Sequence, residues 1–312
     1  MPTRKSPRKG SLQFWPRKRA KKLLPRVNWG EINSEKLLKG FICYKAGMLS
    51  VAVKDNTPHS MTKDKKIVIP ATVLECPPMK ILSVRLYKNG IVATEILSEN
   101  LDKELKKKIK LPKKTTKFDE AKTENYDDVR VLVYSLVKKS KLKKTPDIIE
   151  IGLSGSYDEK INFVKENLGK EISILNSFDK GELIDLRGLT KGKGLQGPVK
   201  RFGITLKSHK SEKGVRRPGS LGPWHPSRVT FRAPQAGQVG MFTRIVYNNK
   251  ILDLGKSENK FKNLKNYGEV NTEYLIVKGS VQGPVKRQLI LTKSFKKTKK
   301  QDKKEYELIE LR

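Results

Sequence analysis

The organisation of this chain is decided by residues 183–249, which read LIDLRGLTKGKGLQGPVKRFGITLKSHKSEKGVRRPGSLGPWHPSRVTFRAPQAGQVGMFTRIVYNN. Two apolar runs of strand character, Leu183–Leu186 and Met241–Tyr247, open and close it. The residues between them are rich in Gly, Pro, Lys and Arg and include a single acid, Glu212. A structureless segment this long is uncommon inside a compact domain and is usually functional or disordered. Because cations are spaced along glycines and prolines, with Trp224 past the middle, we expect a basic finger that binds a polyanion, with RNA the leading candidate.

One hexapeptide in this stretch, Gly192–Gly197, fits the dinucleotide-binding pattern G-x-G-x-x-G and follows a strand-like run. That mechanism also needs a helix whose N-terminus faces the pyrophosphate, and an acid about 20 residues further on. The residues that follow, Pro198–Thr205, have poor helix propensity, and Glu212 lies in a lysine- and glycine-rich loop. We therefore expect no nucleotide site. The glycines instead allow the backbone to lie directly against a phosphate chain.

The residues around these glycines resemble the signature of the universal large-subunit ribosomal protein three family, at Phe178, Asp185, Gly188, Thr190, Gly192, Lys193, Gly194, Gly197 and Arg201. Downstream, Ser220–Pro226 and Ala236–Gly240 are similar to the archaeal and eukaryotic branch. The resemblance extends more loosely to 40–55, 69–97 and 267–292, and residues 98–170 are least like the family core. Glu212 departs from the pattern, since eukaryotic members usually place a basic residue or His there.

The resemblance implies a small translation-factor-like β-barrel with an inserted α/β lobe, an N-terminal extension and a long central finger. It also implies a structural constituent of the large ribosomal subunit, not an enzyme. Such a protein binds large-subunit (23S-type) rRNA directly, nucleates assembly and extends its finger toward the peptidyl-transferase centre. We expect it in the cytoplasm, in the ribosome, beside neighbouring large-subunit proteins, with no cofactor, metal, membrane contact or homo-oligomer.

Outside the central stretch, short apolar runs alternate with Gly and Pro turns, as is typical of a small closed or split β-barrel. Ile81–Tyr87 and Ile91–Leu97 flank an Asn89-Gly90 pair, the strongest short-range signal of a β-hairpin. Asp158–Asn167 predicts a helix with acids in its first turn, and Leu101–Leu111 a short basic helical segment. The fold class is therefore mainly β with an α+β insertion.

These patterns divide the chain into five parts. We expect a basic N-terminal RNA-binding extension over 1–38, a split β-barrel core over 39–97 and 171–292, an inserted α+β lobe over 98–170, a long basic finger loop over 190–238 within the barrel domain, and a basic C-terminal tail with a closing strand over 293–312. The lobe is comparatively rich in acids, including Asp127 and Asp128, so we expect it to be the part least committed to RNA.

The N-terminal segment combines cations with aromatic side chains. Residues 1–30 contain no acid and four prolines, which oppose the amphipathic helix of a transit peptide. Phe14, Trp15 and Trp29 supply aromatic faces on which RNA bases can stack. We expect a tail that folds onto RNA, and a solvated tail is the alternative.

A string of six residues, Gln-Gly-Pro-Val-Lys-Arg, occurs at 196–201 and again at 282–287. We interpret the two copies as equivalent Gly-Pro turns that each present a Lys-Arg pair. The alternative is a repeated β-turn with incidental cations. Within the finger, Trp224 is expected at the tip between two arms, Gly203–Leu221 and Ser227–Val239.

The charge of the whole chain agrees with a nucleic-acid partner. Its 312 residues hold 68 Lys and Arg against 32 Asp and Glu, a formal charge of +36. Cys43 and Cys76 are too few for a disulfide framework and too far apart for a C-x-x-C motif. No P-loop pattern, metal cluster or nucleophile–base set occurs in the basic stretch. Charge alone leaves open a free-standing nucleic-acid-binding protein, chromatin-like or an RNA chaperone.

We therefore predict an rRNA-binding set with no catalytic and no metal-binding residue. Its members are Arg4, Lys5, Arg8, Lys9, Trp15, Arg17, Lys18, Arg19, Lys191, Gly192, Lys193, Gly194, Gly197, Lys200, Arg201, Lys207, His209, Lys210, Lys213, Arg216, Arg217, Trp224, His225, Arg228, Arg232, Gln235, Lys286 and Arg287.

Overall fold

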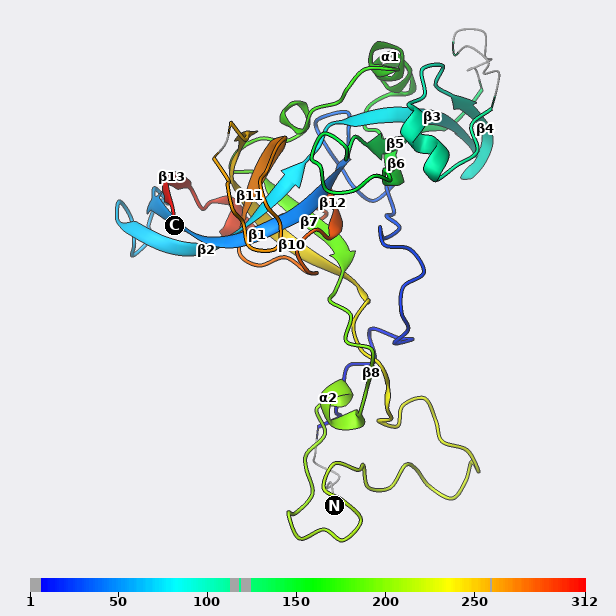
Figure 1. Cartoon of the computed structure of the whole chain (residues 1–312), viewed down its shortest axis with the longest axis vertical. Helices are drawn as coiled ribbons and strands as arrows, with labels where there is room; N and C mark the ends of the chain where they lie inside the picture. The colour runs from blue at the N-terminus through cyan, green and yellow to red at the C-terminus, as the bar shows by residue number, and fades with distance from the viewer. Residues whose placement is uncertain (1–6, 113–117, 119–124, 259) are drawn as a thin grey trace. The chain divides into compact units, whose positions relative to one another are not determined.

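The computed structural model describes residues 7–112, 118, 125–258 and 260–312 (Figure 1). The chain forms two compact units, and each is described by itself. The arm–loop unit consists of Met1–Leu23 and Leu189–Arg244, and the sheet unit of Leu24–Gly188 and Ile245–Arg312. Most regular structure is β, as the sequence predicts.

The larger sheet closes on itself. Its strands pair in the order β12-β7-β10-β11-β2-β1-β13, and β12 also pairs with β1, so six strands form a closed cycle. Their bounds are β1 (Gly40–Asp55), β2 (Lys66–Cys76), β7 (Leu183–Leu189), β10 (Thr243–Lys256), β11 (Glu273–Lys278), β12 (Gln288–Lys293) and β13 (Tyr306–Leu311).

Strand β1 is long enough to serve two neighbours on one edge. Its first part pairs antiparallel with β12, with Gly40 opposite Thr292, and its last part pairs with β13, with Val51 opposite Leu311. Every residue of β12 is buried, which requires protein on both faces of that strand. The C-terminal strand predicted to close a sheet edge is therefore present as β13.

A second sheet of four strands has the order β4-β3-β5-β6. Its strands are β3 (Met79–Lys88), β4 (Ile91–Leu97), β5 (Asp128–Ser135) and β6 (Ile148–Gly152). The predicted hairpin is confirmed, since β3 pairs with β4 and both turn residues have positive φ, 51° at Asn89 and 74° at Gly90. The expectation that residues 39–97 belong to a single barrel is wrong for β3 and β4. The Pro77-Pro78 pair cannot donate to a ladder, and the chain enters a new sheet after it.

Short helices accompany this second sheet: η1 (Lys103–Lys107), α1 (Tyr157–Asn167) and η2 (Ile174–Asn176). The predicted helix over 158–167 is confirmed as α1, where Ser156 and Glu159 form a capping box. The predicted basic helical segment is shorter, a single 3-10 turn, η1. A further short helix, α3 (Lys299–Asp302), precedes β13.

Trp29 joins the two sheets instead of presenting a face to solvent. It is 3% exposed, and a Cβ atom added to Gly40 in β1 or to Gly152 in β6 would lie 2.6 Å from its side chain. Val27, Ile32 and Leu38 are buried beside it in the same core. Residues 24–38 are thus part of the sheet unit, and the expected extension over 1–38 ends earlier. A buried indole stabilises the fold through its large apolar area, and the sequence around Trp29 does not indicate that burial.

The arm–loop unit has little regular structure. It contains a two-stranded ribbon, β8 (Leu195–Gln196) with β9 (Gly237–Gln238), and one short helix, α2 (Pro198–Phe202). The helix corrects the expectation that 198–205 would not be helical. Pro198 occupies the first turn, where its missing N–H costs nothing, and Gly203 ends the helix at φ +66°.

Candidate nucleic-acid interface

The ends of the long loop are joined by main-chain hydrogen bonds. The Lys193 N–H donates to Val239 O over 2.9 Å, and the Val239 N–H donates to Gly194 O over 2.9 Å. Gly240, at φ +80°, lies so close to this ribbon that a Cβ atom there would overlap the Lys191 carbonyl. The two ends of the loop therefore lie together and form a narrow, well-defined base.

Two arginines connect the N-terminal arm to this base. Arg17 Nη1 donates to Arg201 O over 2.8 Å, and Arg201 Nη2 donates to Arg17 O over 3.4 Å. Arg201 also donates to Gln238 O over 3.2 Å and to Gln235 O over 3.1 Å. Both side chains are half-buried, and burial lowers the pKa of each guanidinium, with repulsion from Arg201 adding to the effect at Arg17. Both were predicted to contact rRNA, and here both bind the protein's own carbonyl groups.

Aromatic rings fill the space around this pair. The Trp15 ring lies edge-on to Phe231, with centroids 5.3 Å apart, and 6.2 Å from the Phe202 ring. The Arg17 guanidinium carbon lies 4.3 Å from the Phe202 centroid. Trp15 is half-buried and its Nε1 donates to Ser11 O over 2.9 Å. It is an anchor of the arm in this structure, whereas the sequence predicts a base-stacking face.

Sequence reasoning missed three members of this cluster: Phe202, Phe231 and Arg244. The Arg244 guanidinium carbon lies 4.3 Å from the Phe14 centroid and 5.3 Å from that of Phe242. The signal that could have found Phe202 and Phe231 is their adjacency to an arginine, in Arg201-Phe202 and Phe231-Arg232.

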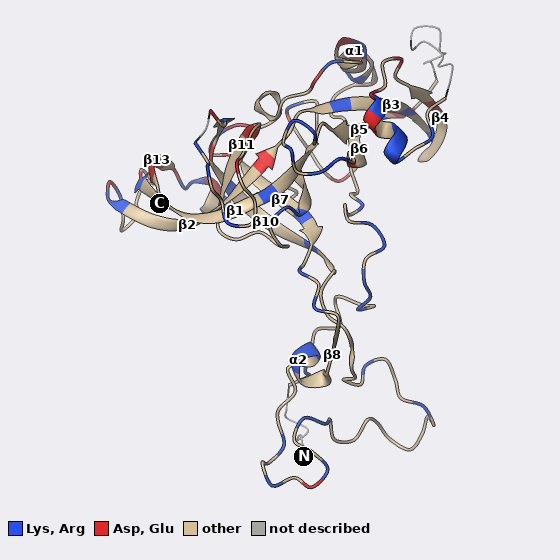
Figure 2. Ribbon diagram, in the orientation of Figure 1, with Lys and Arg blue, Asp and Glu red and all other residues tan. Residues whose placement is uncertain are grey.

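The remaining predicted cations of this unit are exposed. Glu212 is the one acid of the loop, so these cations have few carboxylates to neutralise them, as the blue segments of Figure 2 show. Arg8 is exposed, although one of its guanidinium nitrogens donates to Arg232 O over 3.0 Å. The exposed set comprises Arg8, Lys9, Lys18, Arg19, Lys191, Lys193, Lys200, Lys207, His209, Lys210, Lys213, Arg216, Arg217, His225, Arg228 and Arg232, with Gln235. Arg4 and Lys5 lie outside the described residues.

Trp224 is the most exposed large ring in the unit, at 87%. It lines a shallow cavity of about 330 Å³ together with Leu221, Pro223, Arg228 and Val229. The chain before it is not the extended arm expected over Gly203–Leu221, because the Lys207 N–H donates to Val215 O over 3.1 Å and the intervening residues form turns. This part of the loop is therefore folded back on itself.

The three glycines of the hexapeptide are exposed but differ in conformation. Gly194 has φ +64°, which side chains other than glycine adopt at a cost. Gly197 has φ −69°, and a Cβ atom there would meet no other atom within 4 Å. Gly194 is thus required by the backbone itself, whereas at Gly197 neither the φ angle nor a neighbouring atom excludes a side chain.

The two Gln-Gly-Pro-Val-Lys-Arg strings are not equivalent, so that interpretation was wrong. The first copy enters helix α2, whereas the second is a turn with φ +90° at Gly283 and +66° at Lys286. The second copy is held by Lys45, whose Nζ donates to Gly283 O over 3.3 Å and whose carbonyl accepts from the Lys286 N–H over 2.8 Å. Lys286 is exposed, and burial lowers the pKa of the half-buried Arg287.

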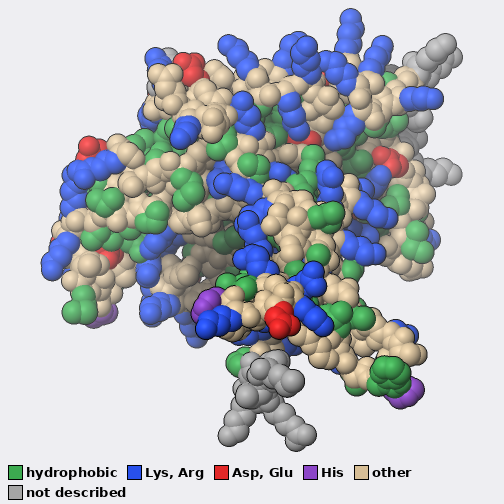
Figure 3. Space-filling model, turned by 60° about the horizontal axis from the view of Figure 1, so that its bottom comes forward, with side chains coloured by type: hydrophobic (Ala, Val, Ile, Leu, Met, Phe, Trp, Pro, Cys, Tyr) green, Lys and Arg blue, Asp and Glu red, His purple; other side chains and the backbone are tan. Residues whose placement is uncertain are grey.

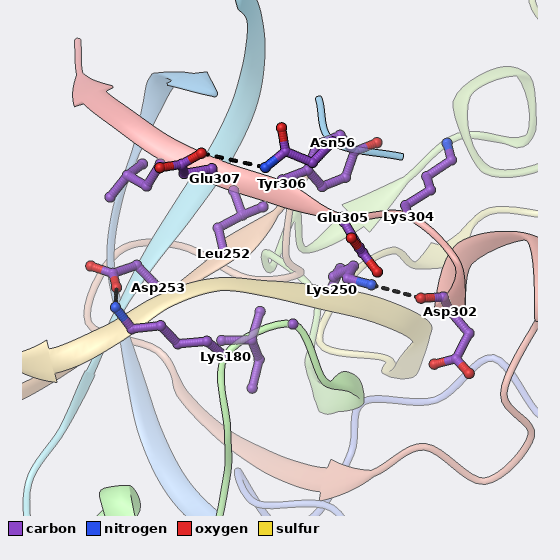
Figure 4. A pocket seen from close by; sticks show the side chains of 13 residues that line it. Asn56, Lys180, Lys250, Leu252, Asp253, Asp302, Lys304, Glu305, Tyr306 and Glu307 are labelled. Atoms are coloured by element: carbon purple, nitrogen blue, oxygen red, sulfur yellow. Dashed lines mark hydrogen bonds and ion pairs between the residues drawn. The ribbon is translucent and has the colours of Figure 1, made fainter. Parts of the chain in front are cut away.

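The sheet unit contains a larger open pocket of about 710 Å³ between β10 and the segment leading into β13 (Figure 4). Several of its polar and charged groups have partners within the protein. Lys180 Nζ lies 2.5 Å from Asp253 Oδ1, and Lys250 Nζ donates to Asp302 O over 2.9 Å. Asn56 Nδ2 donates to Glu307 Oε2 over 3.3 Å. The Lys250–Asp302 contact joins β10 to the C-terminal segment.

In the described parts of the chain, no group of three or more His, Cys, Asp or Glu side chains is placed to hold a metal ion. The same parts contain no helix long and apolar enough to cross a membrane. Lys and Arg side chains cover much of the face shown in Figure 3, with few acids among them. A closed sheet, an irregular basic loop and an exposed tryptophan together are features of a nucleic-acid-binding protein of the β class.

Comparison with known proteins specifies the family. A family model described as Ribosomal protein L3 matches residues 1–312. The large ribosomal subunit protein uL3 of Methanocaldococcus jannaschii is 42% identical over 307 residues, which cover 93% of this chain and 91% of that protein. The protein of the same name from Archaeoglobus fulgidus is 42% identical over 296 residues, 90% of this chain and 89% of that protein. This chain belongs to the ribosomal protein L3 family.

Proposed function

We propose that this chain is a structural constituent of the large ribosomal subunit that binds large-subunit rRNA directly through its arm–loop unit. The observation that carries the proposal is the reciprocal Arg17–Arg201 contact, which holds the base of a loop whose other cations are exposed. Such a base orients many cations together, and each phosphate they neutralise releases counterions. The names of the archaeal relatives support the same assignment.

Within this proposal the loop residues have separate tasks. Lys191, Lys193 and Lys200 lie at the base and contact phosphates there, and the cations of 207–232 contact phosphates further along. The exposed Trp224 stacks on a base, a contact that contributes about 1–3 kcal/mol per base in other proteins. Glycine at 197 lets the RNA backbone approach the main chain.

The sheet unit supplies the support. We infer that its closed six-stranded sheet is the translation-factor-like barrel, and that the four-stranded sheet is the main part of the inserted lobe. By family resemblance the loop extends toward the peptidyl-transferase centre and early binding nucleates assembly. The protein tunes the shape of rRNA there and performs no chemical step itself.

Fractionation of a cell lysate on a sucrose gradient tests the assignment. We expect the protein to migrate exclusively with large subunits. A free or DNA-associated pool would support the alternative, a free-standing nucleic-acid-binding protein. When Lys191, Lys193 and Lys200 are changed to Gln, part of the protein should no longer migrate with large subunits, because all three cations lie on the proposed interface.

A further inference from the structure

A second basic surface lies on the sheet unit, in the lobe that the sequence suggests is least committed to RNA. It is formed by two segments, η1 with the residues after it and the turn that follows β5. Figure 2 shows η1 beside β3 as a largely blue turn. We call this surface the lysine face and define it by its exposed members, Lys103, Lys106, Lys107, Lys108, Lys110, Lys138, Lys139, Lys141 and Lys144.

Apolar packing fixes the two segments side by side. Leu105 of η1 is fully buried in a cluster with Leu82, Tyr134 and Leu136, and Ile109 packs against the same cluster. Two polar contacts reinforce it. Tyr134 Oη donates to Asp102 Oδ2 over 2.7 Å, and Lys108 Nζ donates to Pro146 O over 3.2 Å. The lysine face therefore has a rigid base and is not a flexible charged tail.

Acids neutralise only part of this face. Lys138 lies 3.3 Å from Glu104, Lys139 lies 2.6 Å from Glu171, and Lys108 lies 3.9 Å from Asp147. Two acids of the lobe, Asp127 and Asp128, are engaged elsewhere: Asp128 with Lys160 and Arg130, and Asp127 with the Asn89 N–H. Among the described residues, the ion pairs of this region involve other lysines, and none joins a carboxylate to Lys103, Lys106, Lys107, Lys110, Lys141 or Lys144.

The residue types on the face specify its ligand. All nine cations are lysines, which are point charges without the planar fork that Arg uses to recognise bases or phosphates bidentately. The two segments that form the face, 103–110 and 138–144, contain no aromatic side chain on which an unpaired base could stack. Protein–protein interfaces are depleted in Lys and need an apolar centre, whereas the leucines here point into the core.

We propose that the lysine face is a second rRNA contact, separate from the arm–loop unit, that binds the sugar–phosphate backbone of duplex RNA without reading bases. It rests on the proposed ribosomal function. Backbone contacts of this kind position a protein on RNA and carry no sequence information. The loop then recognises one region through Trp224 while the lysine face sets the orientation of the lobe on another.

Hydroxyl-radical footprinting of the full chain on a large-subunit rRNA transcript tests this. One variant changes Lys103, Lys106, Lys107 and Lys110 to Gln, and a second changes Lys141 and Lys144 to Gln. The matched control changes four other exposed lysines of the sheet unit, Lys63, Lys65, Lys262 and Lys265, to Gln. Gln has nearly the helix propensity of Lys, so the melting temperature should not change.

We expect both lysine-face variants to fail to protect the same duplex tract of the rRNA. The control variant should still protect that tract. The salt dependence of binding should flatten by about 0.9 for each phosphate that is no longer neutralised. Full protection in both variants, or an unprotected tract shared by all three proteins, would overturn the proposal. Protection that appears only in whole subunits and not with rRNA alone would assign the face to an acidic protein and also overturn it. Protection by the arm–loop unit is read separately, so the proposed function can survive either result.

Discussion

Arg17 and Arg201 each donate a guanidinium hydrogen bond to the main-chain carbonyl of the other, over 2.8 Å and 3.4 Å. They lie 184 positions apart in the chain, yet the side chain of each is hydrogen-bonded to the main chain of the other. Cations in a basic segment are usually expected to contact phosphate. These two instead stabilise the part of the protein that carries the proposed phosphate-binding residues.

The first prediction separates a structural cation from a binding one. Lys200→Gln should flatten the salt dependence of rRNA binding by about 0.7–0.9, since one phosphate is then no longer neutralised. Arg201→Gln should instead loosen the base of the loop, because the Arg201 guanidinium donates to four main-chain carbonyls. Limited proteolysis should then cut within 203–238 faster than in the wild type, and faster than in the Lys200 variant.

Arg201→Lys is the control for charge. Lysine retains the positive charge but lacks the fork that reaches several carbonyls at once. It should therefore be cut as rapidly as the Gln variant. Resistance equal to wild type would show that charge, and not geometry, holds the loop.

The second prediction concerns Gly197. Because its φ is −69° and no atom would meet an added Cβ, Gly197→Ala should leave the melting temperature unchanged. Its affinity for rRNA should nevertheless fall if the backbone lies directly against a phosphate chain. Gly194→Ala is the contrast, since φ +64° costs a side chain roughly 1–2 kcal/mol in the folded protein. Wild-type affinity in the Gly197 variant would exclude close approach at that residue.

The third prediction concerns Trp224, whose ring is almost entirely exposed. Trp224→Ala should leave subunit assembly nearly intact, because the ring supports no buried core. It should alter chemical probing of rRNA near the peptidyl-transferase centre and slow or misdirect aminoacyl-tRNA accommodation. Trp224→Phe, which retains a stacking face, should restore most of the wild-type pattern. Unchanged probing in the Ala variant would show that the ring has no RNA contact.

The fourth prediction concerns a buried carboxylate in the sheet unit. Burial raises the pKa of Glu75 above its ordinary 4.5, although hydrogen bonds from Tyr267, Asn271 and Thr272 lower it in part. A raised pKa in the folded state means that the stability contributed by this group is complete below 4.5 and is lost as pH rises through the folded pKa. Glu75→Gln cannot titrate. The free energy of unfolding of wild type minus that of Glu75→Gln should therefore fall as pH rises through this window.

Denaturant unfolding at several pH values measures that difference. Glu99→Gln, at an exposed position, serves as the control for removing a carboxylate from the surface. A wild-type advantage that grows with pH would show that the hydrogen bonds outweigh burial.

Several features of this protein follow from sequence because their causes are local. The Asn89-Gly90 turn needs only two residues that accept positive φ, and the cap of α1 needs only Ser156 and Glu159. The basic loop was identifiable for the same reason, since one acid among many cations excludes a neutral surface whatever the fold. Composition and short-range geometry determine these features.

Other features depended on contacts between distant segments. Residues 79–97 read as barrel strands, but their sheet is set by pairing with β5 and β6. Trp29 is buried because Gly40 and Gly152 leave room for it. Two identical strings at 196–201 and 282–287 adopt a helix and a turn, and the main chain and side chain of Lys45 hold the second.

The cations divide in the same way. From sequence alone Arg17, Arg201 and Lys200 are equivalent positive charges in a segment that binds a polyanion. Tertiary structure distinguishes them, because a guanidinium that finds carbonyl oxygens within the protein is half-buried and engaged, whereas a lysine without such neighbours remains exposed to a ligand. Charge and local conformation are properties of the residues themselves, whereas burial and hydrogen-bond partners exist only once distant segments have met.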